Sequence, residues 1–443
     1  MPTRLLWMRR DLRLADNPAL GAASTDGADV LPVFVLDPVL LRPSGGPRRA
    51  FLAGALADLT DRCGLLVVEG DPRRVVPELA RDCAAESVHV AADFGPYGSR
   101  RDADVEQALG DVPLVRTGSP YAVAPGRVTK DDGTPYKVFT PYSKAWAAHG
   151  WRAPATDART SWRRAPAGWA DRRTTLTASS GAELPEPTEA AAHERWERFR
   201  AERLPAYADE RDRPDLDRTS RLSADLRWGL LHPRTLLAGT GRDGGGEVWR
   251  KELCWREFYA DVLHHSPGSA RTWWDDRWQA MRLDASPVLF DAWREGRTGY
   301  PFVDAGMRQL LGEGWVHNRV RMVVASFLVK DLHLDWRLGA RHFMSHLVDG
   351  DLASNQHGWQ WVAGSGTDAA PYFRIFNPVT QGLRFDPDGD YVRRWVPELR
   401  GIEGKAVHEP WKILHDSHYP EPIVEHGAER DEALRRYEAL RKA

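Results

Sequence analysis

The sequence predicts an α/β domain followed by an all-helical domain. In the first part of the chain, short apolar runs alternate with helical patterns, a spacing typical of a parallel sheet covered by helices on both faces. From residue 191 onward the pattern is helical almost to the end, and strand-like runs are scarce. A chain of 443 residues is also too long for one compact core, so its length favours two domains.

Five apolar runs in the first part have the length of buried strands; they cover residues 4–8, 30–36, 65–69, 88–92 and, more weakly, 114–116. Helical patterns lie between them at residues 17–23, 48–62, 73–84 and 99–109. We therefore expect a parallel, five-stranded, Rossmann-like sheet that binds a ligand beyond the carboxyl ends of its strands. The glycine-rich phosphate fingerprint of dinucleotide folds is absent, so a plain scaffold is the competing interpretation.

Residues 151–190 are rich in proline, alanine, threonine and glycine and show little periodicity, which is typical of a connector. We place the α/β domain at residues 1–130, an interdomain linker at 131–195 and the helical domain at 196–443. The charged amphipathic pattern at residues 425–442 predicts a helix with a solvated face.

The composition excludes several classes of protein. A net charge of −2 argues against a wholly basic nucleic-acid binder, although a local basic groove remains compatible with it. The three cysteines are widely separated and have neither metal-site nor disulfide-framework spacing, as in a reducing cytosol. No apolar run approaches the roughly 20 residues that span a bilayer. We expect a cytoplasmic monomer that does not enter membranes.

Two segments of the helical part carry groups suited to a nucleotide or a base. Three hydroxyls at Thr219, Ser220 and Ser223 precede a helical pattern, where they form either a phosphate cradle or an ordinary capping motif. Further on, Glu252 and Arg256 are four residues apart with an indole between them, so they share one helix face. This face suits recognition of a base, or it is a surface ion pair beside a core tryptophan.

The stretch from residue 298 to 378 combines helical apolar spacing with large polar groups, which need partners when buried. Asn318 and Met322 lie one turn apart, with Arg321 beside them. Asp349 and Asp351 bracket a glycine, and because buried carboxylates are rarely unpaired, Arg321 is the predicted partner of Asp349.

One turn separates Asn355 from Trp359, so these side chains face one way, and Trp361 points elsewhere. The chain contains 19 tryptophans in all. Tryptophans in such numbers either fill helical cores or stack on planar ligands and carry electrons.

With these residues in view, the chain resembles the photolyase/cryptochrome family over nearly its whole length, and most closely the class I cyclobutane pyrimidine dimer (CPD) photolyases. The resemblance rests on ten motifs in the family's order: WMRRDLRLADNPAL, YKVFTPY, TSRLS, WREFY, TGYPFVDAGMRQL, HNRVRM, ASFLVKDL, DGDLASN, GWQW and FRIFNP.

The resemblance implies an FAD cofactor held in the helical domain. The matching cofactor-binding positions are Tyr207, Thr219, Ser220, Leu222, Ser223, Trp249, Glu252, Asn318, Arg321, Asp349, Asp351 and Asn355. Among these, Arg321 would pair with Asp349 beside the flavin ring, Asp351 would meet its polar edge, and Asn355 would face its N5 atom.

The activity implied is light-dependent DNA repair, in which excited reduced FAD donates an electron to a flipped-out pyrimidine dimer, the dimer splits, and the electron returns. The partner implied is UV-damaged DNA containing pyrimidine dimers; photolyases are a standard example of base flipping. The predicted catalytic residues are Glu252, Asn318, Met322, Trp255 and Trp361. The predicted DNA contacts are Arg211, Trp255, Arg256, Arg319, Arg374 and Trp361, and for Arg319 a solvated side chain is the alternative.

The family's electron-supply chain for photoreduction has three tryptophans, and Trp359 and Trp336 match the inner two. Leu283 stands where the outermost is expected. We expect photoreduction to survive through another aromatic side chain. The nearby candidates are Trp273, Trp274 and Trp278. The Gln356-His357 pair is a further departure, where His357 is either a proton-handling residue or a tolerated variation.

The resemblance also implies a second, antenna chromophore. Folate-binding relatives carry an Asn-Glu pair where this chain has Tyr97 to Arg101, so methenyltetrahydrofolate is disfavoured. The predicted site resembles the 8-hydroxy-5-deazaflavin type, with a flavin or no antenna as alternatives. Its residues are Phe34, Val35, Leu36, Asp37, Arg48 and Asp93.

Three other functions compete with CPD repair. A cryptochrome-like light sensor often carries a long C-terminal extension, which this sequence does not show. The (6-4) photolyases use a histidine and a glutamine where Asn318 and Glu252 stand. A dark flavin oxidoreductase would need a substrate-side acid or base that we do not identify.

Overall fold

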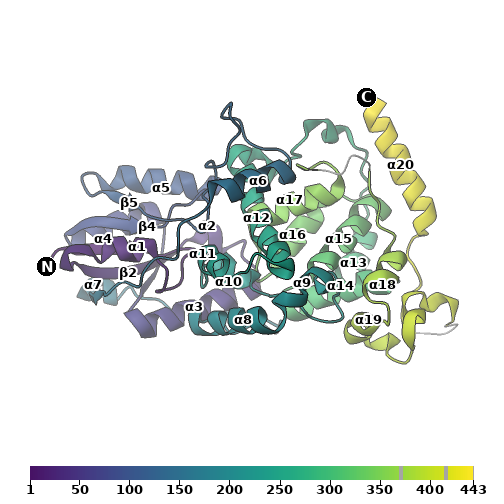
Figure 1. Ribbon diagram of the computed structural model, residues 1–443, viewed down its shortest axis with the longest axis horizontal. Coiled ribbons are helices and arrows are strands. Elements are labelled where there is room, and N and C mark those ends of the chain that lie inside the picture. Colours follow the sequence, from purple (N-terminus) through teal and green to yellow (C-terminus); the bar gives the residue numbers. More distant parts are fainter. Residues whose placement is uncertain (369–372, 414–417, 443) are drawn as a thin grey trace. The chain divides into compact units, whose positions relative to one another are not determined.

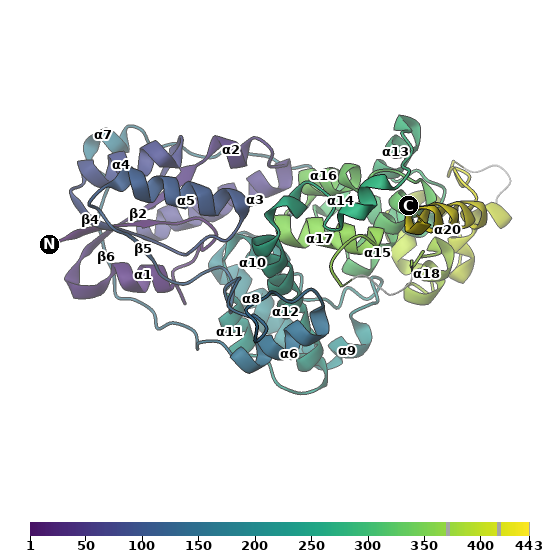
Figure 2. The same cartoon turned by 90° about the horizontal axis from the view of Figure 1, so that it is seen from above.

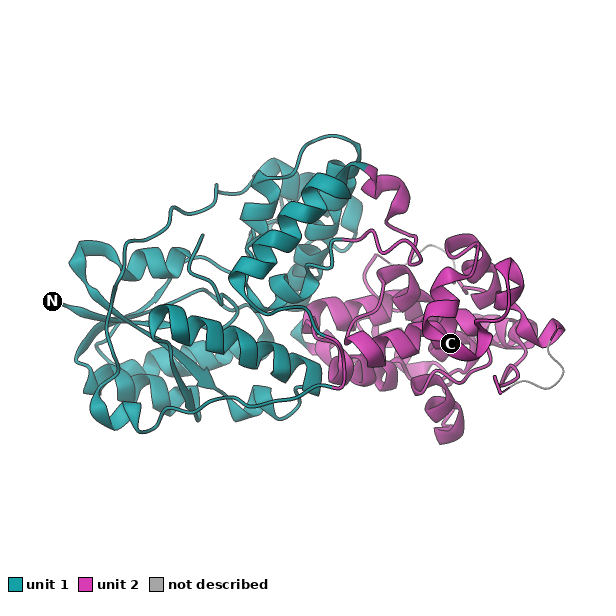
Figure 3. Cartoon of the chain, turned by 90° about the horizontal axis from the view of Figure 1, so that it is seen from below, with its two compact units in different colours: residues 1–180, 184–205, 220–267 teal, residues 181–183, 206–219, 268–443 magenta. Residues whose placement is uncertain are grey.

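The computed structural model describes residues 1–368, 373–413 and 418–442. By its internal contacts the chain divides into two compact units (Figure 3). Residues 1–180, 184–205 and 220–267 form the first unit, and residues 181–183, 206–219 and 268–443 form the second. These units differ from the predicted domains, because several helices after residue 188 group with the sheet. The boundaries at residues 130 and 195 therefore remain a prediction.

A parallel sheet forms the core of the N-terminal part of the first unit (Figures 1 and 2). Its strands are β1 (Thr3–Trp7), β2 (Asp29–Leu36), β3 (Leu66–Glu69), β4 (Ala85–Val90) and β5 (Leu114–Arg116), in the order β3-β2-β1-β4-β5. The prediction of five parallel strands is confirmed. A further short strand, β6 (Ser161–Trp162), pairs in parallel with the start of β2. It lies in the stretch that the sequence assigned to the linker.

Helices connect the strands and cover the sheet. They are α1 (Pro18–Ala23), α2 (Pro38–Leu41), α3 (Gly46–Cys63), α4 (Pro72–Asp82) and α5 (Pro96–Leu109). Several begin with a side-chain cap followed by proline, as in Asn17, which accepts from Leu20 N at 3.1 Å, and Asp71, which accepts from Arg73 N at 3.0 Å. Helices α4 and α5 pack against each other on one face and α1 lies on the other (Figure 2).

The rest of the first unit is helical. It contains α6 (Phe139–His149), α7 (Ala167–Ala170), α8 (Glu189–Glu202), α10 (Ser223–Trp228), α11 (Pro233–Ala238) and α12 (Gly244–His265). Helices α6 and α7 fall within the predicted linker, which is therefore partly ordered. Helix α6 packs against α12.

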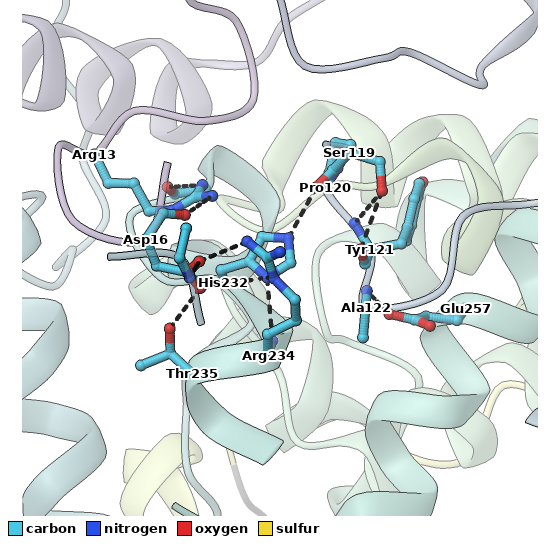
Figure 4. A network of polar contacts seen from close by, with 12 residues as sticks. Arg13, Asp16, Ser119, Pro120, Tyr121, Ala122, His232, Arg234, Thr235 and Glu257 are labelled. Atoms are coloured by element: carbon cyan, nitrogen blue, oxygen red, sulfur yellow. Dashed lines mark hydrogen bonds and ion pairs between the residues drawn. The ribbon is translucent and has the colours of Figure 1, made fainter. Parts of the chain in front are cut away.

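A buried polar network joins α11 to the loop after β1 (Figure 4). Asp16 accepts from Arg234 Nη2 at 2.5 Å, from Thr235 Oγ1 at 2.8 Å and from the Ala155 amide at 2.7 Å. Its own carbonyl oxygen accepts from Arg13 Nη2 at 2.8 Å. Because Asp16 and Arg234 are both nearly inaccessible to water, each charge depends on the other.

A second buried carboxylate, Glu257 on α12, holds the segment that follows β5. It accepts from the amides of Ala122 (2.5 Å) and Val123 (3.0 Å) and from Trp146 Nε1 of α6 at 2.7 Å. With Asp16, Glu257 thus fixes the helices of the first unit onto its sheet domain.

The second unit is a helical bundle around one apolar core. Its helices are α9 (Tyr207–Glu210), α13 (Pro287–Arg294), α14 (Pro301–Glu313), α15 (Asn318–Ser326), α16 (Trp336–His346), α17 (Leu352–Ala363), α18 (Pro378–Phe385), α19 (Asp390–Trp395) and α20 (His426–Lys442). A π-helical segment, Phe327–Asp331, continues α15. None of the described helices combines the length and apolar character needed to cross a bilayer.

Candidate cofactor and substrate site

The predicted pair of Arg321 and Asp349 is present in the second unit. Arg321 lies in the first turn of α15, where its Nη2 donates to Asp349 Oδ2 at 2.8 Å and its Nε donates to the Val316 carbonyl at 2.7 Å. The Asp349 carboxylate is buried, and its other oxygen, Oδ1, has no hydrogen-bond partner among the described residues. Since a buried carboxylate oxygen is rarely left unsatisfied, Oδ1 is suited to accept from a bound ligand.

Helix α17 begins at the second predicted aspartate and carries the predicted asparagine one turn later. Asp351 caps the helix by accepting from Ser354 N at 3.1 Å. Asn355 Nδ2 donates to the Ala340 carbonyl of α16 at 3.1 Å and to Gln356 Oε1 at 2.9 Å. These two bonds fix the plane of the Asn355 amide, which is what a group that must face one atom of a cofactor requires.

The predicted phosphate-binding hydroxyls divide between the two units. Ser223 is the first residue of α10 in the first unit, and Thr219 belongs to the second unit. The Oγ of Ser223 and the Oγ1 of Thr219 are both buried without a hydrogen-bond partner among the described residues. Ser220 Oγ accepts from the Leu222 amide at 3.5 Å. Tyr207, at the start of α9, is buried. Unsatisfied buried hydroxyls at these positions fit a cofactor rich in phosphate oxygens.

The predicted face of α12 is present as a helix face in the first unit. Trp249 is buried and stacks on Trp196, with 5.1 Å between ring centroids. Glu252 and Trp255 are half-buried, and the Trp255 indole stacks on Phe139 at 3.6 Å. This stacking fixes the orientation of the indole, which is what a side chain that packs on a base requires.

The guanidinium of Arg256 is engaged within the first unit. It donates to the Pro120 carbonyl at 3.0 Å and to the Leu226 carbonyl at 3.1 Å, and it lies over the Tyr121 ring. Its contact with DNA stays a prediction. The two hydrogen bonds show that Arg256 also connects α12 to the backbone at Pro120 and Leu226.

The remaining predicted substrate residues lie at accessible positions of the second unit. Asn318 is exposed at the start of α15, and Met322, one turn on, is half-buried. Trp361 is half-buried, and its Nε1 donates to the Asp368 carbonyl at 3.0 Å.

The arginines predicted to contact DNA in the second unit differ in their surroundings. Arg319 pairs with Asp212 at 2.8 Å and lies over the Phe385 ring, so it is not simply a solvated side chain. Arg211 lies 5.9 Å from the Tyr207 ring, and Arg374 is exposed.

Four of the predicted antenna residues, Phe34 to Asp37, lie at the carboxyl end of β2. Phe34, Val35 and Leu36 end the strand, and Asp37 caps α2 through Val39 N at 2.9 Å. Arg48 of α3 is buried. Beyond β4, Asp93 pairs with Arg101 at 3.2 Å.

Sequence reasoning missed one member of this group. Tyr97 donates its hydroxyl to Asp37 Oδ2 at 2.5 Å, and burial together with this bond raises the pKa of Tyr97 to about 12. The only sequence signal was the position of Tyr97 at the start of the helix after the fourth strand.

His357 lies on α17 and is fully buried, and desolvation lowers its pKa to about 4. It is therefore neutral at physiological pH, which does not suit a proton-handling residue. In the unfolded chain its pKa is near 6.5, so the unfolded state binds the extra proton first as the pH falls.

We expect the wild-type protein to lose roughly 3 kcal/mol of stability relative to His357→Gln between about pH 6.5 and pH 4, since each pKa unit corresponds to about 1.4 kcal/mol. Urea unfolding of both proteins across this range measures the difference. Parallel pH profiles for the two proteins would contradict the neutral assignment.

Comparison with known proteins gives a consistent result. Residues 249–439 match the family model described as the FAD binding domain of DNA photolyase, and residues 4–160 match the model described as DNA photolyase. A deoxyribodipyrimidine photo-lyase of Salmonella typhimurium is 43% identical, with 100% of both chains covered.

Solved structures agree with this. A class III photolyase from Agrobacterium tumefaciens superimposes with a TM-score of 0.90 at 36% identity, covering 100% of this chain and 98% of the other. An archaeal photolyase from Sulfolobus tokodaii, solved with two FAD molecules, superimposes with a TM-score of 0.86 at 28% identity. This match covers 99% of this chain and 100% of the other. The family and the fold predicted from the sequence are thereby confirmed.

Proposed function

Because the chain belongs to the DNA photolyase family, we propose that it is a light-driven deoxyribodipyrimidine photo-lyase that repairs cyclobutane pyrimidine dimers in UV-damaged DNA. The observation that carries this proposal is the full-length match to the Salmonella typhimurium enzyme of that activity, at 43% identity. The match covers 100% of both chains, so it spans the segments that carry the predicted cofactor residues and the predicted substrate residues.

The residues of this chain fit FAD. Asp349 Oδ1, Thr219 Oγ1 and Ser223 Oγ are buried polar atoms without a partner among the described residues, at positions where the family resemblance implies the cofactor. In this proposal the hydroxyls hold the phosphates, and the pair of Arg321 and Asp349 holds the polar side of the ring. FAD, when bound and reduced, supplies the light-driven electron that splits the dimer.

The chain's own task is to bind and orient the dimer. Glu252 and Asn318 would hydrogen-bond the polar edges of the two pyrimidines, and the Glu252 carboxyl would stabilise the charge that develops on them. Met322, Trp255 and Trp361 would pack on the flipped-out bases. The half-buried or exposed positions of these five side chains are compatible with contact to a substrate that enters from outside.

DNA binding would use Arg211, Arg256, Arg319 and Arg374. The overall charge of −2 means that attraction to phosphates must come from such local groups. A cytoplasmic, monomeric protein is part of the proposal. It accords with Cys63, Cys83 and Cys254, which are buried and form no disulfides.

For the antenna we propose 8-hydroxy-5-deazaflavin at the carboxyl end of β2. Support comes from the buried Asp37 and Arg48 and the partly buried Tyr97, whose groups can bind a polar heterocycle, and from the lack of the Asn-Glu pair expected for folate. The Sulfolobus tokodaii protein, with two FAD molecules, makes a flavin the alternative. An absorption spectrum of protein from a deazaflavin-producing host distinguishes the chromophores.

The test of repair uses chemically reduced protein, UV-damaged oligo(dT) and blue light. We expect thymines to be restored under light and not in the dark. Repair of a (6-4) photoproduct instead of the CPD would favour the (6-4) alternative. Tight binding of the cofactor without restoration of either lesion would favour a light sensor.

A further inference from the structure

Four aromatic rings of the second unit form a continuous series from a buried tryptophan to the protein surface. Trp336 of α16 is fully buried, and its ring centroid lies 5.9 Å from that of Trp273. Trp273 lies 5.9 Å from Trp278, and Trp278 lies 5.9 Å from Tyr437 of α20. Tyr437 is partly exposed to solvent. Rings in contact at these distances allow an electron to pass from one to the next.

The structure also shows where the expected third tryptophan is replaced. Leu283 lines a small pocket together with Trp336, Trp273 and Trp278. The leucine therefore stands next to the ring that the usual outermost tryptophan would contact. A saturated side chain cannot be oxidised at accessible potentials, but the indoles of Trp273 and Trp278 line the same pocket.

The position of Tyr437 is fixed by its neighbours. The adjacent Arg436 pairs with Asp284 through two bonds of 3.0 and 2.9 Å and donates to the Arg282 carbonyl at 3.2 Å. The phenol ring also stacks on Phe373, with 4.5 Å between centroids. These contacts hold α20 against the segment that contains Leu283, so the last ring is not on a loose terminus.

The inner end of the series approaches Trp359. Helices α16 and α17 pack together, and Gly339, one turn after Trp336, lies directly under the Trp359 ring, where a Cβ atom would come within 2.1 Å of it. A further tryptophan beside Trp359 is Trp293, at 6.0 Å, which is itself fully buried. Its stacked neighbour Phe290 is much harder to oxidise than an indole.

We propose that electrons for photoreduction enter this protein through Tyr437, Trp278 and Trp273, a route that replaces the missing outermost tryptophan. The proposal rests on the proposed function, because it assumes that light oxidises Trp359 next to the bound flavin.

In this route one electron moves inward at each step, from Trp336 to Trp359, from Trp273 to Trp336, and from Trp278 to Trp273. Tyr437 then gives one electron to Trp278 and releases its phenolic proton to water. An external thiol restores Tyr437 by donating a hydrogen atom, and two of the resulting thiyl radicals combine to a disulfide. Each electron that reaches Trp359 is thus replaced by one electron from the thiol.

The first experiment measures photoreduction of the oxidised holoprotein in the presence of a thiol. We expect Trp278→Phe to slow it by about tenfold or more, equivalent to a barrier increase of about 1.4 kcal/mol. Trp395→Phe is the matched control, since Trp395 is a partly buried tryptophan of the same unit that packs on Gly312, away from the series. Adding Leu283→Trp to Trp278→Phe should restore the rate, because it supplies a ring beside Trp336.

The second readout identifies the radical. Illuminated wild-type protein should give the electron paramagnetic resonance spectrum of a tyrosyl radical, and Tyr437→Phe should give that of a tryptophanyl radical. An unchanged tyrosyl spectrum in Tyr437→Phe, or full-speed photoreduction in folded Trp278→Phe, would overturn the route.

Repair by chemically reduced protein separates this proposal from the proposed function. The route is not needed once the cofactor is reduced, so Trp278→Phe should repair dimers as the wild type does. If the chemically reduced wild type does not repair dimers under light, the enzyme assignment is refuted. If Trp278→Phe repairs dimers and also keeps full photoreduction, only the route is refuted.

Discussion

Replacement of Asp349 by alanine should destabilise the protein by about 3 kcal/mol, the lower end of the range for breaking a buried ion pair. The carboxylate is almost fully buried, and Arg321 retains partial contact with water, which moderates the cost of leaving the guanidinium unpaired. Urea unfolding followed by circular dichroism measures the change.

A double-mutant cycle shows whether the pair itself is responsible. Arg321→Met combined with Asp349→Ala should be clearly less destabilising than the sum of the two single changes, because neither partner is then left as an unpaired charge. Purely additive effects would show that the two side chains do not depend on each other. The neighbouring Asp351→Ser, which keeps a capping oxygen for α17, is the control and should change stability little.

The sequence predicted this pair for a reason that holds generally. Arg321 lies on a strongly periodic helix, and Asp349 lies in a glycine turn within the same stretch, so the requirement that a buried carboxylate has a cation left few candidates. Strand and helix periodicity likewise located β1 to β5 and their connecting helices. These features depend on residues close in sequence.

Features that depend on distant residues were not predictable in this way. The two residues of β6 are too few to show any alternation, and its pairing with β2 joins residues more than 130 positions apart. The charged pattern of α20 predicted a solvated face, yet Tyr437 on that helix contacts Trp278. Nothing in local periodicity links a C-terminal helix to a tryptophan 159 positions earlier.

Asp16 is the strongest case of a contact hidden from the sequence, because its partner Arg234 is 218 residues away. We expect Asp16→Ala to destabilise the first unit by about 3–5 kcal/mol, since both partners are buried and Arg234 would keep an uncompensated charge. The Thr235 hydroxyl and the Ala155 amide would lose their acceptor as well.

Asp26 provides a matched control for this experiment. Both aspartates have a positive φ, 43° at Asp16 and 58° at Asp26. Alanine tolerates this backbone conformation less well than aspartate, so the substitution has a similar backbone cost at each position. Asp26, however, is exposed and makes only a surface ion pair with Arg4, at 3.2 Å. Asp26→Ala should therefore cost about 1 kcal/mol or less beyond the shared backbone effect.

The difference between the two variants isolates the buried network. If Asp16→Ala unfolds at the same urea concentration as Asp26→Ala, the network does not stabilise the first unit. Arg234→Met added to Asp16→Ala should recover part of the loss, because the methionine removes the buried charge and keeps most of the side-chain volume. Such recovery would identify the unpaired guanidinium, and not the loss of packing, as the main cost of the Asp16 change.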